Sequence, residues 1–167
     1  MSRILVAYAT KHGATAEIAE RIGQVFREAG LQADVISADR VDDLTPYGAV
    51  VLGSAIYIGR WRKEAVKFLK ANEQALAERK VWLFSSGPTG EGDPLELVDG
   101  REVPEQLQPI VDRIQPQDVV VFHGAMDTDD LNFLEKFAIK NVGAPLGDFR
   151  DWEAIAAWAN SLIEKLA

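Results

Sequence analysis

The stretch RILVAYATKHGATAEIAERIGQVFREAG, residues 3–30, combines three local patterns. Residues 3–9 are nearly all apolar, as in a strand that is buried on both faces of a parallel sheet. Residues 10–15 are polar or small and predict a loop. The remainder predicts a helix that ends at Gly30, with an apolar stripe formed by Ile18, Ile22, Val25, Phe26 and Ala29. The stretch therefore predicts a strand, a loop and a helix in succession.

The same alternation continues through the chain. Further apolar runs predict strands at 31–37, 49–56, 80–86 and 118–124. Apolar stripes predict three further helices. The first has Trp61, Ala65, Phe68, Leu69 and Leu76 on one face, and the second has Leu107, Ile110, Val111 and Ile114, with Pro109 in its first turn or at a kink. The last helix is expected to be N-capped by Asp151 and to bury Trp152, Ile155, Ala159, Leu162, Ile163 and Leu166. The chain is thus expected to be an α/β protein with three layers, in which helices cover both faces of a five-stranded parallel sheet of order 2-1-3-4-5.

No repeat or dividing linker interrupts the pattern, so we expect residues 1–167 to form a single domain. Residues 87–103 are rich in Gly, Pro and acidic residues and predict a long loop. A helical insertion is expected at about 126–147, with an apolar face formed by Leu131, Phe133, Leu134, Phe137, Ala138 and Val142. Because such a helix is buried or packs on another molecule, we expect it to cover the ligand site or to line a homodimer contact.

Composition excludes several classes of function. The chain has 18 Lys and Arg against 26 Asp and Glu, and a net charge of −8 argues against binding to nucleic acid. The absence of cysteine excludes thiol catalysis and disulfides, and two histidines predict no metal centre. No apolar run approaches the roughly 18 residues that span a bilayer, and no leader pattern is seen, so we expect a cytoplasmic protein without an integral membrane segment.

The loop after the first strand lies where a doubly wound sheet binds its ligand, at the switch point between strands one and three. Thr10 and Thr15 place hydroxyls at its two ends, and Gly13 allows a ligand to approach the backbone. The positive end of the following helix favours a phosphate monoester. The alternative is a helix start that only caps itself.

Other phosphate motifs do not fit this loop. It lacks the Gly-Lys followed by Ser or Thr of a P-loop and the G-x-G-x-x-G of a dinucleotide fold. A phospho-accepting receiver domain needs acidic residues after the first strand, where this chain has Ala9, Thr10 and Lys11.

The loop resembles that of the flavodoxin family, whose pattern is T/S-x-T/S-G-x-T/S. Thr10, Gly13 and Thr15 match it, whereas His12 departs from it. The resemblance implies an FMN cofactor. Its phosphate would bind Thr10, Lys11, His12, Gly13, Ala14 and Thr15, and its ring would lie between two further loops formed by Ser54, Ala55, Ile56 and Tyr57, and by Ser86, Gly87, Pro88, Thr89 and Gly90. Tyr57 is a candidate platform for the ring or a surface residue, while Trp61 is expected in the core.

One flavodoxin-like subgroup, the menaquinone-dependent protoporphyrinogen oxidases and their relatives, resembles nearly the whole chain. The likeness includes YATKHGAT (8–15), GSAIYIGRWRKE (53–64), the insertion and DFRDWEAIAAWA (148–159). The insertion begins with MDTDDLNF (126–133), which is acidic where a substrate with carboxylates favours positive charge.

The first hypothesis is therefore an FMN-binding redox protein that passes electrons or hydride equivalents through the flavin to a redox protein or a quinone-like small molecule. In it no side chain needs a catalytic role, because the flavin does the chemistry. The alternatives are a dehydrogenase of the protoporphyrinogen oxidase type and a flavin-free binding module.

Overall fold

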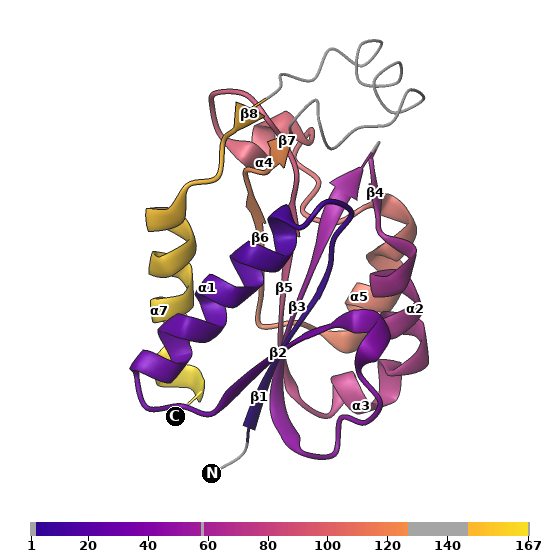
Figure 1. Cartoon of the computed structure of the whole chain (residues 1–167). Helices are drawn as coiled ribbons and strands as arrows, with labels where there is room; N and C mark the ends of the chain where they lie inside the picture. The colour runs from indigo at the N-terminus through magenta and orange to yellow at the C-terminus, as the bar shows by residue number, and fades with distance from the viewer. Residues whose placement is uncertain (1–2, 58, 127–146, 167) are drawn as a thin grey trace.

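Parallel strands form the central sheet of the protein (Figure 1). The computed structural model describes residues 3–57, 59–126 and 147–166. The parallel strands of the described part are β1 (Arg3–Ala9), β2 (Ala33–Ser37), β3 (Tyr47–Tyr57), β5 (Lys80–Ser86) and β6 (Asp118–Phe122). They lie in the order β2-β1-β3-β5-β6, which confirms the predicted order 2-1-3-4-5 when the parallel strands alone are counted.

Two short antiparallel strand pairs accompany the parallel strands. β4 (Arg60–Trp61) turns back and pairs antiparallel with the end of β3, as the sixth strand of the sheet. β7 (Ala125–Met126) pairs antiparallel with β8 (Gly147–Asp148) in a separate two-stranded sheet.

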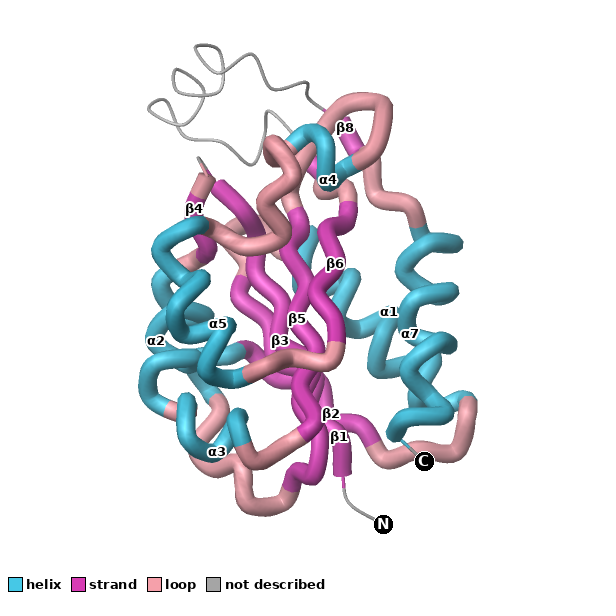
Figure 2. The backbone as a smooth tube through the Cα atoms, turned by 180° about the vertical axis from the view of Figure 1, so that it is seen from behind, coloured by secondary structure: helices cyan, strands magenta, loops and turns pink. Residues whose placement is uncertain are grey.

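Helices cover both faces of the sheet, as predicted, and give three layers (Figures 1 and 2). One face carries α1 (Ala14–Glu28) and α7 (Trp152–Leu166), which lie against each other. The other face carries α2 (Lys63–Ala71), α3 (Glu73–Ala77) and α5 (Gln108–Ile114). Short helical turns are η1 (Ala38–Arg40), α4 (Pro94–Leu97) and η2 (Glu105–Leu107).

The sheet separates two hydrophobic cores, because its strands are apolar on both sides. The core under α1 and α7 contains Phe26, Trp82 and Phe84, all fully buried. Full burial of such side chains stabilises the fold by about 1.5–3 kcal/mol each. Trp158 of α7 meets the Phe84 and Phe122 rings edge-on, with centroids 6.4 and 5.7 Å away, which fixes α7 on β5 and β6.

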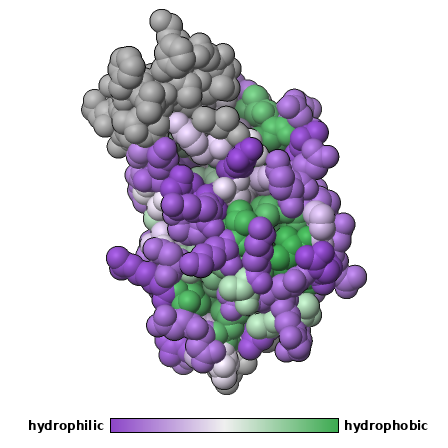
Figure 3. All heavy atoms as spheres, turned by 90° about the vertical axis from the view of Figure 1, so that its right-hand side faces the viewer, coloured by the Kyte–Doolittle hydropathy of each residue, from purple (hydrophilic) through white to green (hydrophobic). Residues whose placement is uncertain are grey.

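The outer surfaces are mostly polar. Figure 3 shows hydrophilic side chains around smaller hydrophobic areas on the side that carries α2 and α3. Of the large apolar side chains that the structure describes, Leu97 and Trp152 are the exposed ones, at 43% and 37%. The predicted position of Trp152 on the inner face of the last helix is therefore wrong.

Trp61 was predicted on a helical stripe and lies in β4 instead, although its expected place in the core is confirmed at 5% exposure. Its indole Nε1 donates a hydrogen bond of 2.8 Å to the Ser85 hydroxyl, which donates in turn to the Glu102 carbonyl at 2.7 Å. The predicted helix that follows is two helices, because the Asn72 side chain bonds the Phe68 carbonyl and ends α2 there.

Other boundaries also differ from the predictions. β3 extends to Tyr57, so residues 54–57 belong to a strand, whereas β2 starts at Ala33 and β6 ends at Phe122. The stretch 87–103 contains α4, whose N-cap Asp93 accepts a hydrogen bond from the Leu95 N–H. The predicted helix of the insertion falls in 127–146, outside the described residues.

The residues predicted to mark helix ends are confirmed in these roles. Gly30 adopts a left-handed φ of +86° directly after α1. Pro109 sits in the first turn of α5, and the Asp151 carboxylate accepts from the Ala154 N–H at 3.0 Å at the start of α7.

Replacing Ser85 by Ala leaves the buried Trp61 N–H without its acceptor, and we expect the free energy of unfolding to fall by about 1–3 kcal/mol. In a Trp61→Phe background there is no indole N–H to lose its acceptor, so Ser85→Ala should lower the free energy of unfolding by clearly less. Urea unfolding of the four proteins of this cycle measures the coupling. Equal losses of unfolding free energy in both backgrounds would contradict a stabilising Trp61–Ser85 hydrogen bond.

Asp34 accepts hydrogen bonds from Arg3 (2.7 and 3.1 Å) and from the Tyr47 hydroxyl (2.8 Å), and the Arg3 bond holds the pKa of Asp34 below its ordinary 3.8. A lowered folded-state pKa stabilises the fold above the unfolded value, and this stabilisation is lost as the pH falls through the folded value. Asp34→Asn should therefore destabilise the protein at pH 7 and destabilise it less at pH 2, below the unfolded value. Urea unfolding at both pH values tests this, with the exposed Asp112→Asn as control.

Candidate functional site

The segments predicted to form the site lie side by side at the carboxyl edge of the sheet. In the parallel register Ala9 of β1 faces Ser54 of β3, and Ser54 faces Ser85 of β5. β1 and β5 end within one residue of this level, whereas β3 continues past it to Tyr57, so the predicted ligand segments 10–15, 54–57 and 86–90 all begin at this edge. Which of their residues touch a ligand stays a prediction.

The first of these segments is a closed turn that opens α1. The Gly13 N–H donates to the Thr10 hydroxyl at 3.0 Å, and Gly13 has a left-handed φ of +94°. The N-cap residue of the helix that starts at Ala14 is Gly13, which has no side chain to cap it. The first N–H groups of a helix lack partners within the helix, so this end can receive an anion through its backbone.

Side chains of the first segment differ in exposure. His12 is exposed, Thr10, Lys11 and Ala14 are half-buried, and Thr15 is buried with 1% exposure. The Thr10 hydroxyl shapes the turn, because it accepts the Gly13 hydrogen bond. The backbone is thus the main feature that the first turn of α1 offers a ligand.

Lys11 links the first segment to the second. Its ammonium lies 4.2 Å from the centroid of the Tyr57 ring, within the range of a cation–π interaction. Tyr57 stands at the end of β3 opposite Arg60 of β4 and is half-buried. A positive charge and an aromatic face are thereby brought together beside the α1 turn.

In the second segment, Ser54 has a structural role. Its hydroxyl is fully buried, accepts from the Arg62 N–H and donates to the Ala55 carbonyl, both at 2.9 Å. Ala55 and Ile56 are half-buried and continue the strand toward Tyr57. Ser54 therefore holds the start of α2 rather than pointing into an open site.

The third segment packs closely against its neighbours. A Cβ atom on Gly87 would lie 2.6 Å from the Ile56 carbonyl oxygen, and one on Gly124 would lie 2.5 Å from the Gly87 Cα. Ser86 and Thr89 are buried, whereas Pro88 and Gly90 are half-buried. The segment is thus pressed between the end of β3 and the chain after β6.

His123 fixes the path of the third segment, a role that sequence reasoning missed although the residue stood out at a strand end. Its Nε2 atom lies 2.8 Å from the Gly92 carbonyl, and Nδ1 lies 3.4 Å from the Pro88 carbonyl. The Gly124 N–H also donates to the Pro88 carbonyl, at 2.9 Å. A neutral imidazole has one N–H and donates to one of these carbonyls, and the shorter distance favours Gly92, while the Gly124 N–H holds Pro88 at the other end of the 88–92 turn.

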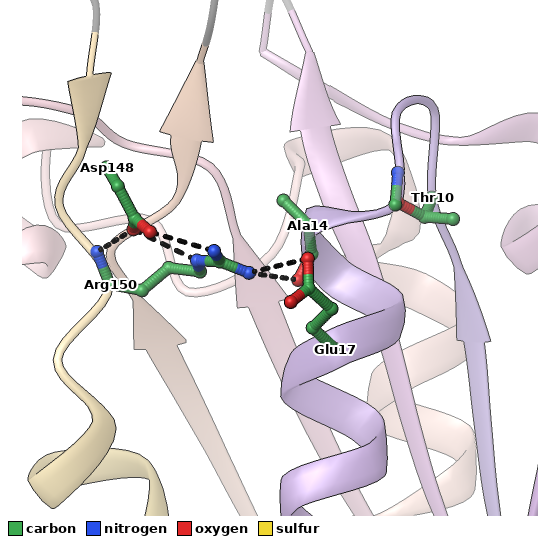
Figure 4. Close-up of polar contacts among 6 residues, drawn as sticks. Thr10, Ala14, Glu17, Asp148 and Arg150 are labelled. Carbon is green, nitrogen blue, oxygen red and sulfur yellow. Dashed lines mark hydrogen bonds and ion pairs between the residues drawn. The ribbon is translucent and has the colours of Figure 1, made fainter.

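Arg150 was also missed. It follows β8 and reaches the first turn of α1, where Nη1 donates to the Ala14 carbonyl at 3.3 Å and lies 3.4 Å from a Glu17 oxygen (Figure 4). Its Nε and Nη2 atoms donate to both oxygens of Asp148 at 3.0 and 2.8 Å. This pairing holds the pKa of Asp148 below its usual range.

Across residues 3–57, 59–126 and 147–166, no group of His, Asp and Glu side chains is arranged to hold a metal ion. None of the helices in that part of the chain combines the length and apolar character that crossing a bilayer requires.

Comparisons with known proteins agree with the sheet order. Residues 5–152 match the flavodoxin domain family. Protoporphyrinogen IX dehydrogenase (quinone) of Escherichia coli K12 is 23% identical over 181 residues, which cover 96% of this chain and 94% of that protein.

Solved structures show the same fold. A flavodoxin from the domain Archaea has a TM-score of 0.63 at 17% identity, and 98% of each chain is covered. Oxidised flavodoxin 2 from Bacillus cereus has a TM-score of 0.63 at 22% identity, with 98% of this chain and 99% of that chain covered. Because the family match spans most of its length and the sheet has the corresponding order, this chain belongs to the flavodoxin domain family.

Proposed function

We propose that the protein binds FMN at the carboxyl edge of its sheet and transfers electrons or hydride equivalents through the flavin. The observation that carries this proposal is the start of α1. Its N-cap residue is the left-handed Gly13, which has no side chain, and it opens between the ends of β1 and β3. Family membership supports a flavin as the ligand.

The phosphate of FMN would bind the turn formed by residues 10–15. The backbone N–H groups of the first turn of α1 supply donors, and the helix dipole favours the negative charge. Among the residues that the structure describes, none lies within 4 Å of a Cβ built on Gly13, so they leave the approach to this backbone open. The turn thus suits a phosphate in both shape and polarity.

The ring would lie along residues 54–57 and 86–90. Tyr57 offers an aromatic face, and its contact with Lys11 holds it beside the phosphate turn. Pro88 and Gly90 are half-buried at the facing segment, which His123 and Gly124 hold in place. These residues bind and orient the ring, and Lys11 supplies a positive charge near it.

Bound FMN supplies the redox chemistry, so the protein's contribution is position, exclusion of water and charge. The proposed electron acceptor is a redox protein or a quinone-like small molecule. The name of the Escherichia coli relative, which specifies a quinone, supports the second of these.

A second candidate is a dehydrogenase of the protoporphyrinogen type. It is favoured by that same relative, which aligns with 96% of this chain. The FMN-loaded protein is assayed with a quinone and one of two electron donors, protoporphyrinogen or a simple reductant. Quinone reduction with protoporphyrinogen alone indicates substrate-specific oxidation, whereas reduction with both donors indicates general electron transfer.

The test of FMN binding is the visible absorption spectrum of the purified protein after FMN is added and the excess removed by gel filtration. A retained flavin band with one phosphorus per chain is expected. A colourless protein would overturn the redox proposal and favour the flavin-free binding module.

Replacing Gly13 by Ala puts a side chain on a left-handed backbone conformation that costs about 1–3 kcal/mol, and the turn relieves this strain by leaving the conformation that binds phosphate, so we expect FMN affinity to fall by about fivefold to a hundredfold. Gly30→Ala is a matched control, because Gly30 has a φ of +86°, equally open space, and lies at the other end of α1. It should lower stability and leave FMN affinity unchanged. Equal affinities of the two variants would place the phosphate elsewhere.

Replacing His123 by Ala removes a side-chain hydrogen bond that holds the 88–92 turn, so we expect weaker binding of the ring. Riboflavin and FMN share the ring and differ in the phosphate. Their affinities should therefore fall by the same factor, about threefold to tenfold for one lost positioning contact. Titrations monitored by flavin fluorescence measure both, and a loss confined to FMN would contradict the ring assignment.

A further inference from the structure

Arg150 occupies an unusual place for a cation. Its guanidinium contacts the carbonyl of Ala14, the first residue of α1, on the side where the helix dipole is positive. Positive side chains are unfavourable at that end of a helix. The fold nevertheless holds the side chain there with only 10% exposure.

The contacts of Arg150 explain how this position is kept. Asp148 binds the guanidinium through two parallel hydrogen bonds and also accepts from the Arg150 backbone N–H at 3.0 Å. The guanidinium stacks over the Trp152 ring, 4.8 Å from its centroid, which explains why this tryptophan remains at the surface. The side chain is thus fixed in one geometry by both charge and stacking.

The charges of this cluster bear on the phosphate. Figure 4 shows Glu17 and Asp148 on opposite sides of the guanidinium, with Glu17 on the first turn of α1. Without Arg150, two carboxylates would face the helix end that receives the phosphate, and both would repel a dianion. With Arg150 the three side chains carry a net charge of −1, whereas without it they would carry −2.

We propose that Arg150 determines the preference of this site for a phosphorylated flavin over the same flavin without its phosphate, by offsetting one of the two negative charges of Glu17 and Asp148 beside the start of α1. The inference rests on the proposed function. It adds a specificity-determining residue that lies outside the 10–15 turn and approaches the helix from its side.

The alternative explanation is mechanical, because Arg150 also ties β8 and the start of α7 to α1. A purely mechanical role would loosen the site for every flavin. The ratio of the dissociation constants of riboflavin and FMN separates the two roles, since the phosphate is the only difference between the ligands. This ratio needs no electron donor or acceptor.

The experiment titrates the full-length protein with FMN and with riboflavin, at low and at high salt. For Arg150→Gln we expect FMN affinity to fall about tenfold or more and riboflavin affinity to change less than about threefold. Arg150→Lys keeps the charge and should retain most of the preference. Added salt should reduce the difference between wild type and Arg150→Gln.

Glu17→Gln gives an opposite and independent prediction. It removes one of the two carboxylates whose charge Arg150 partly offsets, and because Glu17 is 66% exposed we expect the preference for FMN to rise by about twofold to threefold. In the Arg150→Gln background it should restore part of the lost preference. Should Arg150→Gln fail to fold, Glu17→Gln alone decides, and an unchanged ratio overturns the proposal.

His123→Ala is the matched control on the ring side, where both affinities should fall together. Equal losses for FMN and riboflavin in Arg150→Gln would show that Arg150 acts through the fold alone and would overturn the proposal. A wild-type protein that binds neither flavin would instead overturn the proposed function, so the two failures are distinguishable.

Discussion

The parallel register of β1, β3 and β5 is the constraint on which the rest of the site depends. Ala9, Ser54 and Ser85 lie at one level, so the chain leaves three neighbouring strands at the same edge. A shift of one residue would turn every side chain of a strand to the opposite face. Because both faces of this sheet are buried, the apolar cores hold the register and thereby place the turn before α1 next to Tyr57.

Residues from the last third of the chain hold the edge of the sheet in place. His123 and Gly124 bind carbonyl groups of residues 88–92, and Arg150 binds the Ala14 carbonyl. All of these contacts are made to backbone atoms. They therefore fix the path of the two segments without restricting their side chains, which leaves the side chains available for a ligand.

The parts of the structure that depend on local signals could be predicted from the sequence. The apolar run of β1, Gly13 and Gly30 define strand, turn and helix within 30 residues, and the sheet order follows from the alternation of strands and helices. Trp61 and Trp152 were misplaced, because each continues the apolar period of a helix, Trp61 from just before α2 and Trp152 from the first position of α7. Tertiary partners, the Ser85 hydroxyl and the Arg150 guanidinium, decide their actual places. The contact of Arg150 with Ala14 spans 136 positions and has no local signal.

The close packing of Gly87 and Gly124 has a consequence for how this protein can change in evolution. A larger residue in a crowded position is usually tolerated after a neighbour becomes smaller. Here each position already carries the smallest residue, and the third contact is the backbone oxygen of Ile56, which no substitution can shorten. Neither glycine has a compensating partner, so variation near this edge is confined to exposed positions such as Glu91.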